Sequence, residues 1–445
     1  MKSGKRSAGK FAGWLTAQGV SLHEREESVR SDIYWHMICL FTMQTPMKMA
    51  LHVYVERKVC MVHYKLATEN QKELANLAYS IVKDKLGPQL AELEKTESFP
   101  QDVREALNAA GFANVGIPAE YGGLGLGVVD RCLIYEEMGK IDAAFAFAYH
   151  GDSTRHLINS NLPEDQKQYW LKRQLAGESY GCFGVTEPSA GSDIFALRTT
   201  AVKDGDEWVI NGTKCFASQA AIADWGCFLA WTDKSLGSKG LTAFFIERER
   251  GWQVTKVEEK MGFRLSPTCD VVLDNIRVPD DHIVGKVGEG LKHAMSSITE
   301  ARITTMSCAI GMAQAALDYA VQYAKERRQK GKRIIDFQGV GFMIADMQTK
   351  IDAARALLYY TAEVIDRGLS PDTLGSETKN FVAKVVMDVT IDAVQVLGGY
   401  GLMKDYPVEK YMRDAKVFSI FEGTTQINQQ TIAKAIAGKD PQEQK

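Results

Sequence analysis

The sequence predicts a multidomain α+β protein in which a helical domain is followed by a β domain and then by a helical bundle. Apolar residues recur at helical spacing from about residue 68 to 177, and β-rich runs separated by turn residues fill residues 181–279. Long helical periods return after residue 290. Because strands and helices do not alternate, a doubly wound dinucleotide fold is disfavoured, and no G-x-G-x-x-G motif follows a strand.

The composition changes define the expected domain limits. We expect an N-terminal α-helical domain, a central β-barrel or sandwich, a C-terminal four-helix bundle and a short tail, at residues 61–179, 180–285, 286–438 and 439–445. Residues 1–23 are basic and acid-free, as in a transit peptide, but acids appear from Glu24 onward. We interpret residues 1–60 as a leader or a non-native upstream extension. The expected location is cytoplasmic, or the mitochondrial matrix if this segment is a transit peptide.

Particular stretches predict the individual elements. Helical periods in the first domain cover residues 70–86, 99–111 and 128–142, and a further helix is expected over residues 143–157. In the β domain, residues 199–218 contain Asp-Gly and Asn-Gly turns between β-rich runs, and further strands are expected within residues 241–249, 252–259 and 269–279. The bundle helices are expected at residues 298–329, 337–368 and 375–399.

Charge and cysteine usage exclude several classes of function. A net charge of −3 gives no overall attraction to nucleic acid or to anionic membranes. The apolar run at residues 33–41 is too short for stable membrane insertion. Eight scattered cysteines form no C-x-x-C pair and do not cluster with histidines, so we expect reduced thiols and no metal site.

Three stretches carry residues with chemical potential. In "SIFEGTTQIN", residues 419–428, Glu422 stands shortly before a helical pattern at Thr431 to Ala437, either as an acid favoured by the helix dipole or as a catalytic base. The Gly- and Ser-rich residues 181–193 form either a surface turn or a backbone cradle for a phosphate or flat ring. Phe216 either stacks on such a ring or packs in the core.

The ordered motifs "GVTEPSAGSD", "INGTKCFAS", "AKERRQKGK", "VQVLGGYG", "YPVEKYMRDAK" and "FEGTTQI" resemble those of the acyl-CoA dehydrogenase family, and the resemblance covers roughly residues 61–438. It implies FAD, an acyl-CoA substrate, an electron-transfer flavoprotein as acceptor and a homotetramer. Glu422 takes the position of the family's base, which removes the α-proton of the thioester while a hydride leaves the β-carbon for flavin N5, as in β-oxidation.

The same resemblance implies binding roles. The FAD contacts would be Phe183, Val185, Thr186, Ser192, Phe216, Ser218, Arg327, Gln338, Gln395, Gly399, Thr424 and Gln426. Four of these would reach the FAD of a neighbouring subunit, namely Arg327, Gln338, Gln395 and Gly399. The substrate contacts would be His150, Asp152, Ser192, Thr299, Arg302 and Gly423.

Departures from the family pattern bear on the substrate. Some members of the family carry the base immediately before the Arg that corresponds to Arg302. In this chain that position is Ala301, which cannot act as a base. Glu300, one residue earlier, is turned about 100° around the helix, so we expect it to be solvated or ion-paired. Ala146 replaces the Arg of glutaryl-CoA relatives. His150 and Asp152 make the acyl-slot segment polar, which indicates a short, cyclic or polar acyl group with Asp152 as a second base, or else helix contacts. An acyl-CoA oxidase and a non-catalytic flavin-binding scaffold are the alternative functions.

Overall fold

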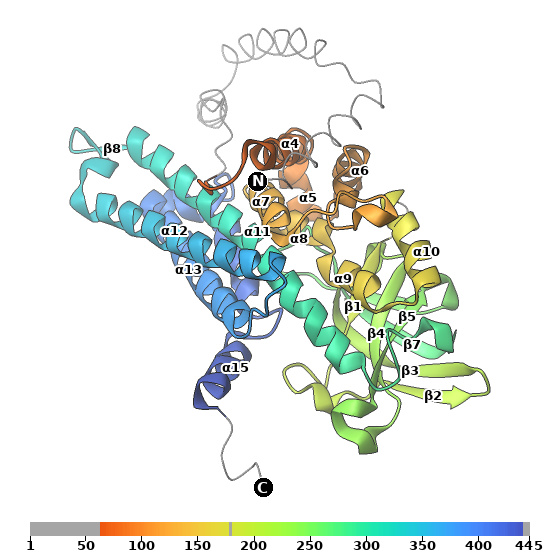
Figure 1. Cartoon of the computed structure of the whole chain (residues 1–445). Helices are drawn as coiled ribbons and strands as arrows, with labels where there is room; N and C mark the ends of the chain where they lie inside the picture. Colours follow the sequence, from red (N-terminus) through yellow and green to blue (C-terminus); the bar gives the residue numbers. More distant parts are fainter. Residues whose placement is uncertain (1–62, 178–179, 439–445) are drawn as a thin grey trace. The chain divides into compact units, whose positions relative to one another are not determined.

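The computed structural model describes residues 63–177 and 180–438. The chain divides into two compact units, Met1–Glu73 and Leu74–Lys445. The expected leader at residues 1–60 and the tail at residues 439–445 lie outside the described residues. Figure 1 shows the larger unit with its helices, its sheet and its long C-terminal helices labelled.

The N-terminal region is helical, as the sequence predicts. Its helices are α4 (Glu69–Leu86), α5 (Leu90–Thr96), α6 (Gln101–Ala109), α7 (Val128–Gly139), α8 (Ala143–His150), α9 (Asp152–Asn161) and α10 (Glu164–Leu175). The expectation of one helix over residues 143–157 is wrong, because Gly151 adopts a left-handed conformation, with φ of 53°, and separates α8 from α9. Helix α8 begins where Asp142 Oδ1 accepts a hydrogen bond from the Phe145 amide at 2.7 Å.

The central domain is built on one mixed, seven-stranded sheet. Its strands are β1 (Gly181–Gly184), β2 (Thr200–Asp204), β3 (Glu207–Ser218), β4 (Trp225–Trp231), β5 (Leu241–Glu247), β6 (Gln253–Val257) and β7 (Thr268–Pro279). The order is β1-β4-β2-β3-β7-β6, with β5 paired to β4, and β1 runs parallel to β4. The predicted Asp-Gly turn joins β2 to β3, with φ of 62° at Gly205. The predicted Asn-Gly turn is wrong, because Gly212 lies inside β3 beside a register shift.

The sheet has a hydrophobic core on each face. Alternate residues of β4 contribute to the two cores, since Phe228 joins Phe244 and Trp252 on one face while Trp225 joins Phe245 on the other. The second core also contains residues of α9 and α10, so these helices cover that face. Every residue of β4 is buried. Such a strand lacks polar alternation, which explains why the sequence pattern did not reveal it.

Long helices form the C-terminal bundle. They are α11 (Gly290–Glu326), α12 (Gln338–Asp366), α13 (Leu374–Leu397), α14 (Val408–Ala415) and α15 (Thr425–Ala437), with a small hairpin of β8 (Arg328–Gln329) and β9 (Lys332–Arg333) after α11. Helices α11, α12 and α13 run side by side (Figure 1). Helix α15 begins six residues before the expected start at Thr431, because the Thr424 hydroxyl caps it by accepting the Ile427 amide at 3.2 Å.

Helix α7 joins the first domain to the bundle through backbone contact. A Cβ atom added at Gly311 of α11 would lie 2.0 Å from the Glu136 carbonyl oxygen, and one added at Gly139 of α7 would lie 2.4 Å from the Cys308 carbonyl oxygen. Only glycine permits these two approaches. The Glu136 carboxylate also accepts hydrogen bonds at 2.9 Å from Arg355 and at 2.8 Å from Tyr359, both on α12. The three helices are therefore fixed against one another by packing and by a buried ion pair.

Candidate active site

The Glu422 carboxylate stands on a tight turn just before α15. Glu422 itself has φ of 54° and Gly423 has φ of 85°. A residue other than glycine in this region costs about 1–3 kcal/mol and persists only where its surroundings hold it. Two side chains do so here. Arg302 of α11 donates from Nε to the Glu422 carbonyl oxygen at 3.0 Å, and the buried Asn428 donates from Nδ2 to the Gly423 carbonyl oxygen at 2.8 Å.

Three charged groups act on one another at this turn. Burial raises the pKa of Glu422, although the charges of Arg302 and Lys379 pull it down. Burial likewise lowers the pKa of Arg302, against the pull of Glu422. Lys379 of α13 is 0% exposed, and burial together with the Arg302 charge lowers the pKa of its ammonium to about 8. The half-buried carboxylate therefore sits in a partly dehydrated, cationic surrounding.

The residue preceding Glu422 belongs to an aromatic cluster. The Phe421 ring centroid lies 5.1 Å from that of Phe147 on α8 and 5.8 Å from that of Phe263, which precedes β7. Phe418 packs against the rings of both Phe263 and Phe421. The cluster brings the expected acyl-slot helix, the central domain and the Glu422 turn together. This apolar wall beside a single carboxylate is suited to an apolar substrate chain.

Of the two polar residues in the acyl-slot segment, the structure describes the side chain of His150 but not that of Asp152. His150 is buried, and its Nε2 lies 3.1 Å from Thr305 Oγ1 of α11 while its ring packs against Tyr135 and Phe147. These contacts support the interpretation that His150 packs between helices. Asp152 begins α9, but its side chain lies outside the part of the chain that the structure describes. Its role as a second base stays a prediction.

Glu300 is ion-paired, as the sequence predicts. Its carboxylate lies 2.6 Å from the Arg131 guanidinium and 3.2 Å from His156 Nδ1. Burial alone would raise the pKa of Glu300, but the His156 hydrogen bond and the Arg131 charge lower it to about 2. A carboxylate bound in this way is a poor proton acceptor, so Glu422 is the better base of the two. Thr299, one residue earlier, is half-buried and donates to the Met295 carbonyl oxygen at 3.0 Å.

The Gly- and Ser-rich loop after β1 is anchored beside β3. Phe183 and Val185 pack against the core, and the Thr186 carbonyl oxygen accepts the Cys215 amide at 2.9 Å. Ser192 is exposed on this loop. Ser218 pairs with Thr268 of β7 within the sheet. The backbone of the loop is thereby held against β3.

Glu187 fixes the same loop from inside. Its buried carboxylate accepts a hydrogen bond from the Lys214 ammonium at 2.7 Å and from the Thr199 hydroxyl at 2.5 Å, and Lys214 is 0% exposed at its side chain. Burial alone would raise the pKa of Glu187, but the Lys214 charge and these hydrogen bonds lower it below its ordinary value. The loop is therefore tied to β3 by a buried ion pair.

The side chain of Phe216 is exposed to solvent near this anchored loop. Phe216 is 64% exposed and has φ of 54°, at the β3 register shift between Lys214 and Ala217. A β-bulge re-aims a side chain away from its sheet. An exposed ring on a rigid bulge, beside a loop of small residues, fits a flat aromatic ligand such as a flavin.

The four residues expected to reach a neighbouring subunit are all exposed. Arg327 ends α11, and its guanidinium carbon lies 6.0 Å from the centre of the Tyr400 ring. Gly399 adjoins that ring, and Gln395 lies one turn earlier, at the end of α13. Gln338 is the first residue of α12. The structure therefore brings Arg327, Gln395 and Gly399 to the same end of the bundle.

Thr424 and Gln426 flank the start of α15. Thr424 serves as the helix cap, and Gln426 is exposed in the first turn. The sequence interpretation missed Lys379, Asn428 and the aromatic cluster. A lysine within the buried stripe of α13, on the same face as Val382 and Val386, was the available signal for Lys379.

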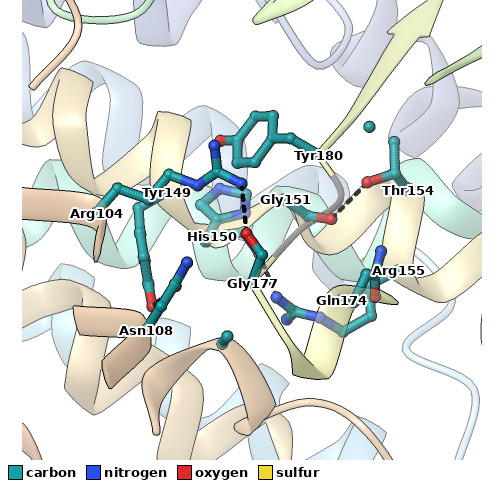
Figure 2. Close-up of a pocket in the computed structure, with 12 residues that line it drawn as sticks. Arg104, Asn108, Tyr149, His150, Gly151, Thr154, Arg155, Gln174, Gly177 and Tyr180 are labelled. Atoms are coloured by element: carbon teal, nitrogen blue, oxygen red, sulfur yellow. Dashed lines mark hydrogen bonds between the residues drawn. The ribbon is translucent and has the colours of Figure 1, made fainter. Parts of the chain in front are cut away.

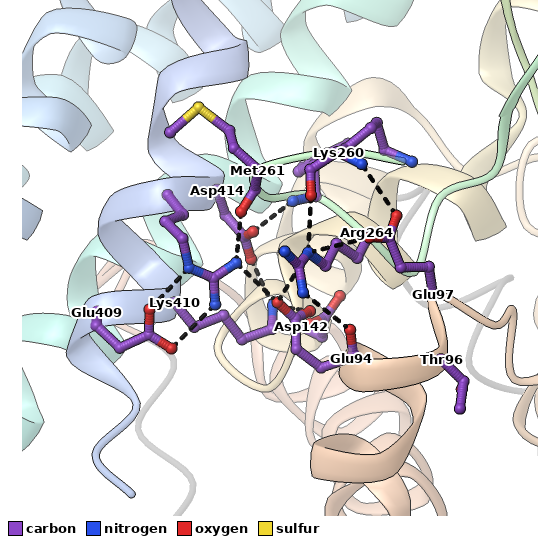
Figure 3. Close-up of polar contacts among 12 residues, drawn as sticks. Glu94, Thr96, Glu97, Asp142, Lys260, Met261, Arg264, Glu409, Lys410 and Asp414 are labelled. Atoms are coloured by element: carbon purple, nitrogen blue, oxygen red, sulfur yellow. Dashed lines mark hydrogen bonds and ion pairs between the residues drawn. The ribbon is translucent and has the colours of Figure 1, made fainter. Parts of the chain in front are cut away.

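A buried network of charged side chains links α14 to the elements around the site. Lys410 of α14 donates to Asp142, the cap of α8, at 2.6 Å and also contacts Asp414 (Figure 3). Asp414 in turn accepts the Phe263 amide. Arg413 lies 2.8 Å from the Glu94 carboxylate of α5. These bonds connect the helix preceding Glu422 to α8 and to the loop that carries Phe263.

A separate polar cavity of about 50 Å³ lies between α6, α8, α9, α10 and β1. The Arg104 guanidinium stacks over the Tyr180 ring at 4.4 Å, and Tyr149 donates to Asn108 Oδ1 at 3.0 Å (Figure 2). Burial raises the pKa of Tyr180. A cavity of this size holds about one or two waters rather than a thioester.

Within residues 63–177 and 180–438, no helix has the length and apolar character needed to cross a membrane. The same ranges contain no cluster of three or more histidine, cysteine, aspartate or glutamate side chains that could hold a metal ion. The six cysteines within these ranges are buried free thiols.

Three family models match the chain. They are described as "Acyl-CoA dehydrogenase, N-terminal domain", "middle domain" and "C-terminal domain", at residues 68–178, 182–276 and 288–437. The cyclohex-1-ene-1-carbonyl-CoA dehydrogenase of Geobacter metallireducens is 38% identical over 83% of this chain and 98% of its own length.

Solved structures are also similar to this chain over most of its length. Butyryl-CoA dehydrogenase from Megasphaera elsdenii has a TM-score of 0.81 and 34% identity, over 84% of this chain and 99% of its own. A chain in a structure described as the electron transferring flavoprotein of Acidaminococcus fermentans also has a TM-score of 0.81, with 38% identity over 84% of this chain and 100% of its own.

Proposed function

Because the chain belongs to the acyl-CoA dehydrogenase family, whose members are FAD-dependent oxidoreductases, we propose that it oxidises the Cα–Cβ bond of an acyl-CoA thioester with Glu422 as the base. The observation that carries the proposal is the strained turn of Glu422, held by Arg302 beside an apolar wall. A base positioned against an apolar chain is what removal of a weakly acidic α-proton requires.

The residues of the chain have separate tasks in this reaction. Glu422 accepts the α-proton on its carboxylate, and its raised pKa makes it a stronger base than an ordinary glutamate. The ring of Phe147 and its aromatic neighbours exclude water from the acyl chain. Arg302 keeps the turn in place through the Glu422 carbonyl oxygen. The product would be the α,β-unsaturated thioester.

FAD fits the residues of the central domain. Phe183, Val185, Thr186, Ser192, Phe216 and Ser218 would hold it, with Thr424 and Gln426 on the side of the base. When bound, FAD supplies the acceptor for the hydride that leaves the β-carbon. The exposed ring of Phe216 would cover one face of the flavin. Electrons would then pass to an electron-transfer flavoprotein, in accord with the similarity to a chain of the Acidaminococcus structure.

A homotetramer would complete the cofactor sites. The exposed Arg327, Gln338, Gln395 and Gly399 would contact the FAD of a neighbouring copy. Exposed apolar side chains near them also favour a partner surface, and these are Phe342, Tyr400, Leu402 and Met403. Light scattering on the purified holoenzyme tests this directly. A monomer that retains FAD fully would contradict the shared site.

The central experiment is an anaerobic titration of the purified flavoprotein with straight, branched, cyclic and dicarboxylic CoA thioesters. We expect at least one of them to bleach the flavin absorbance. The Glu422→Gln variant should stay yellow and lose the bleaching, because an amide accepts no proton at neutral pH. Bleaching by the variant at the wild-type rate would refute the role of Glu422. Peroxide formation in air without an added acceptor would instead favour an oxidase.

A cyclic acyl group is a second candidate substrate, supported by the 38% identity to the Geobacter enzyme. In that case Asp152 would act as a second base. The Asp152→Ala variant should then lose turnover of cyclic thioesters and retain that of short straight ones. An unchanged rate on every substrate that is turned over would dismiss Asp152.

A further inference from the structure

Lys379 is a buried ammonium whose surroundings offer it no hydrogen bond. Its side chain is 0% exposed, and its Nζ has no hydrogen-bond partner among the described residues. It occupies the buried stripe of α13 with Ser376, Val382 and Val386. Burying a lysine without a partner costs free energy that a methionine or leucine at this position would avoid. An ammonium in this environment acts strongly on a neighbouring charge, because little water screens it.

Helix α13, which carries Lys379, contacts the segment that follows Glu422. The next residue, Asn380, donates from Nδ2 to the Thr425 carbonyl oxygen at 3.2 Å, so this turn of α13 abuts the start of α15. Helix α11 brings Arg302 to the same loop, where its guanidinium nitrogen would lie 3.5 Å from a Cβ added at Gly423. Helices α11 and α13 therefore both contact this short loop, and the charges of Arg302 and Lys379 both act on Glu422.

The other charged groups around the loop are otherwise engaged or exposed. Glu300 of α11 is paired with Arg131, and His150 of α8 contacts Thr305. Glu377 of α13 accepts a hydrogen bond from Thr373. On the flanking segments, Lys416 and Lys434 are exposed. The charges that act on Lys379 are those of Arg302 and Glu422, and those that act on Glu422 are Arg302 and Lys379.

We propose that Lys379 is a positioning residue that, together with Arg302, keeps the Glu422 carboxylate ionised and ready to accept the α-proton. The inference rests on the proposed function of Glu422. Two charges in a dehydrated site interact far more strongly than they do in water, and a nearby cation lowers the pKa of a carboxylate. Lys379 thus limits the rise in pKa that burial imposes on Glu422. Without it, a larger fraction of the base would be protonated at moderately acid pH.

The test is the pH dependence of flavin reduction, measured by anaerobic rapid mixing of the FAD-bound enzyme with a saturating thioester that bleaches it. In Lys379→Met, we expect the acid limb of the rate profile to move about one pH unit toward alkaline pH, so that reduction is about tenfold slower below the limb and unchanged above it. Lys379→Arg keeps the charge and should follow the wild-type profile.

A matched control removes a lysine charge from the same helix. Lys384 is exposed on α13 and paired with Asp388 at 2.6 Å, and Lys384→Met should leave the profile unchanged. Should Lys379→Met fail to retain FAD, Lys379→Gln replaces it, with the same shift expected. Superimposable profiles of the charge-removing and wild-type enzymes would overturn the inference while leaving the function intact. An equal shift in Lys379→Arg would indicate a packing effect and would overturn it as well.

The same measurements separate failure of this inference from failure of the proposed function. If wild-type flavin is not bleached by any thioester, or if Glu422→Gln is bleached as fast as wild type, the proposed reaction is wrong and the inference falls with it. If only the Lys379 profiles are unchanged, the base acts without assistance from α13.

Discussion

The buried ion pair between Glu187 and Lys214 yields a quantitative prediction about the central domain. We expect Lys214→Met to destabilise it strongly, because the variant leaves the Glu187 carboxylate buried without its cation. Both side chains are almost fully buried, with 3% and 0% of their surfaces exposed. Breaking such a pair from one side costs about 3–5 kcal/mol.

The hydrogen bonds around the pair set where in this range the value falls. Glu187 retains bonds from the Thr199 hydroxyl and from the amides of Arg198 and Thr199 when Lys214 is removed. The Leu229 and Val185 carbonyl oxygens lose the ammonium as a donor, the former at 2.6 Å. Each unsatisfied acceptor costs about 1–3 kcal/mol. We therefore expect a loss near the upper end, about 4–5 kcal/mol.

Equilibrium unfolding in urea, followed by tryptophan fluorescence, measures this loss. Four tryptophans, Trp208, Trp225, Trp231 and Trp252, lie in the central domain, so the signal reports its unfolding. The double variant Glu187→Gln/Lys214→Met should recover at least about half of the loss, since no isolated charge remains buried. Because the pair anchors the loop proposed to hold FAD, the single variant should also release the cofactor at lower urea concentrations.

An exposed pair in the same domain supplies the control. Lys203 lies 2.5 Å from Asp280, but the two side chains are 37% and 65% exposed. Lys203→Met should cost less than about 1 kcal/mol. If Lys214→Met costs no more than Lys203→Met, or if the double variant is less stable than the single one, the reasoning from buried charge is refuted.

Three further substitutions test the pKa values and the helix crossing. Burial raises the pKa of Glu422 in the folded protein above its ordinary value of 4.5, so the free energy of unfolding decreases as pH rises from 4.5 through the raised pKa. Glu422→Gln should therefore raise the urea midpoint at pH 7, and this gain should shrink toward pH 4. The pKa of Glu300 is lowered from 4.5 to about 2, so its stabilisation is present above pH 4.5 and is lost as pH falls toward 2. Glu300→Gln should cost about 3 kcal/mol at pH 7 and little at pH 2. Gly311→Ala should lower the melting temperature by several degrees, because its Cβ would lie 2.0 Å from the Glu136 carbonyl oxygen, whereas Gly87→Ala, with no atom within 4 Å, should not.

The order of the domains could be read from the sequence because hydrophobic period distinguishes helices from strands over long stretches. The failures were local. Gly151 divides an apolar helix by adopting positive φ, which a helical period cannot reveal. Strand β4 is buried throughout and therefore shows no alternation. Helix α15 begins earlier than predicted because its first turn is mostly polar and shows no apolar period, so only the Thr424 cap marks its start.

The family motifs predict which residues form the candidate site, and the geometry shows how these residues are held. Glu422 and Arg302 lie 120 positions apart, and no sequence pattern predicts that the guanidinium of one binds the carbonyl oxygen of the other. Glu300 as an ion-paired residue was predictable from helix geometry. Lys379 was missed because a single lysine in an apolar stripe carries little weight without knowledge of which face is buried.

The reciprocal glycine contacts of Gly139 and Gly311 limit how the molecule can deform. Because a carbonyl oxygen packs against a glycine Cα at two points of this one crossing, α7 and α11 have no room to slide or roll over each other. If the proposed acyl site widens, we therefore expect the change to occur in the turns around this crossing rather than within it. Directed evolution toward larger substrates should accordingly accumulate changes in the turns and leave this crossing untouched.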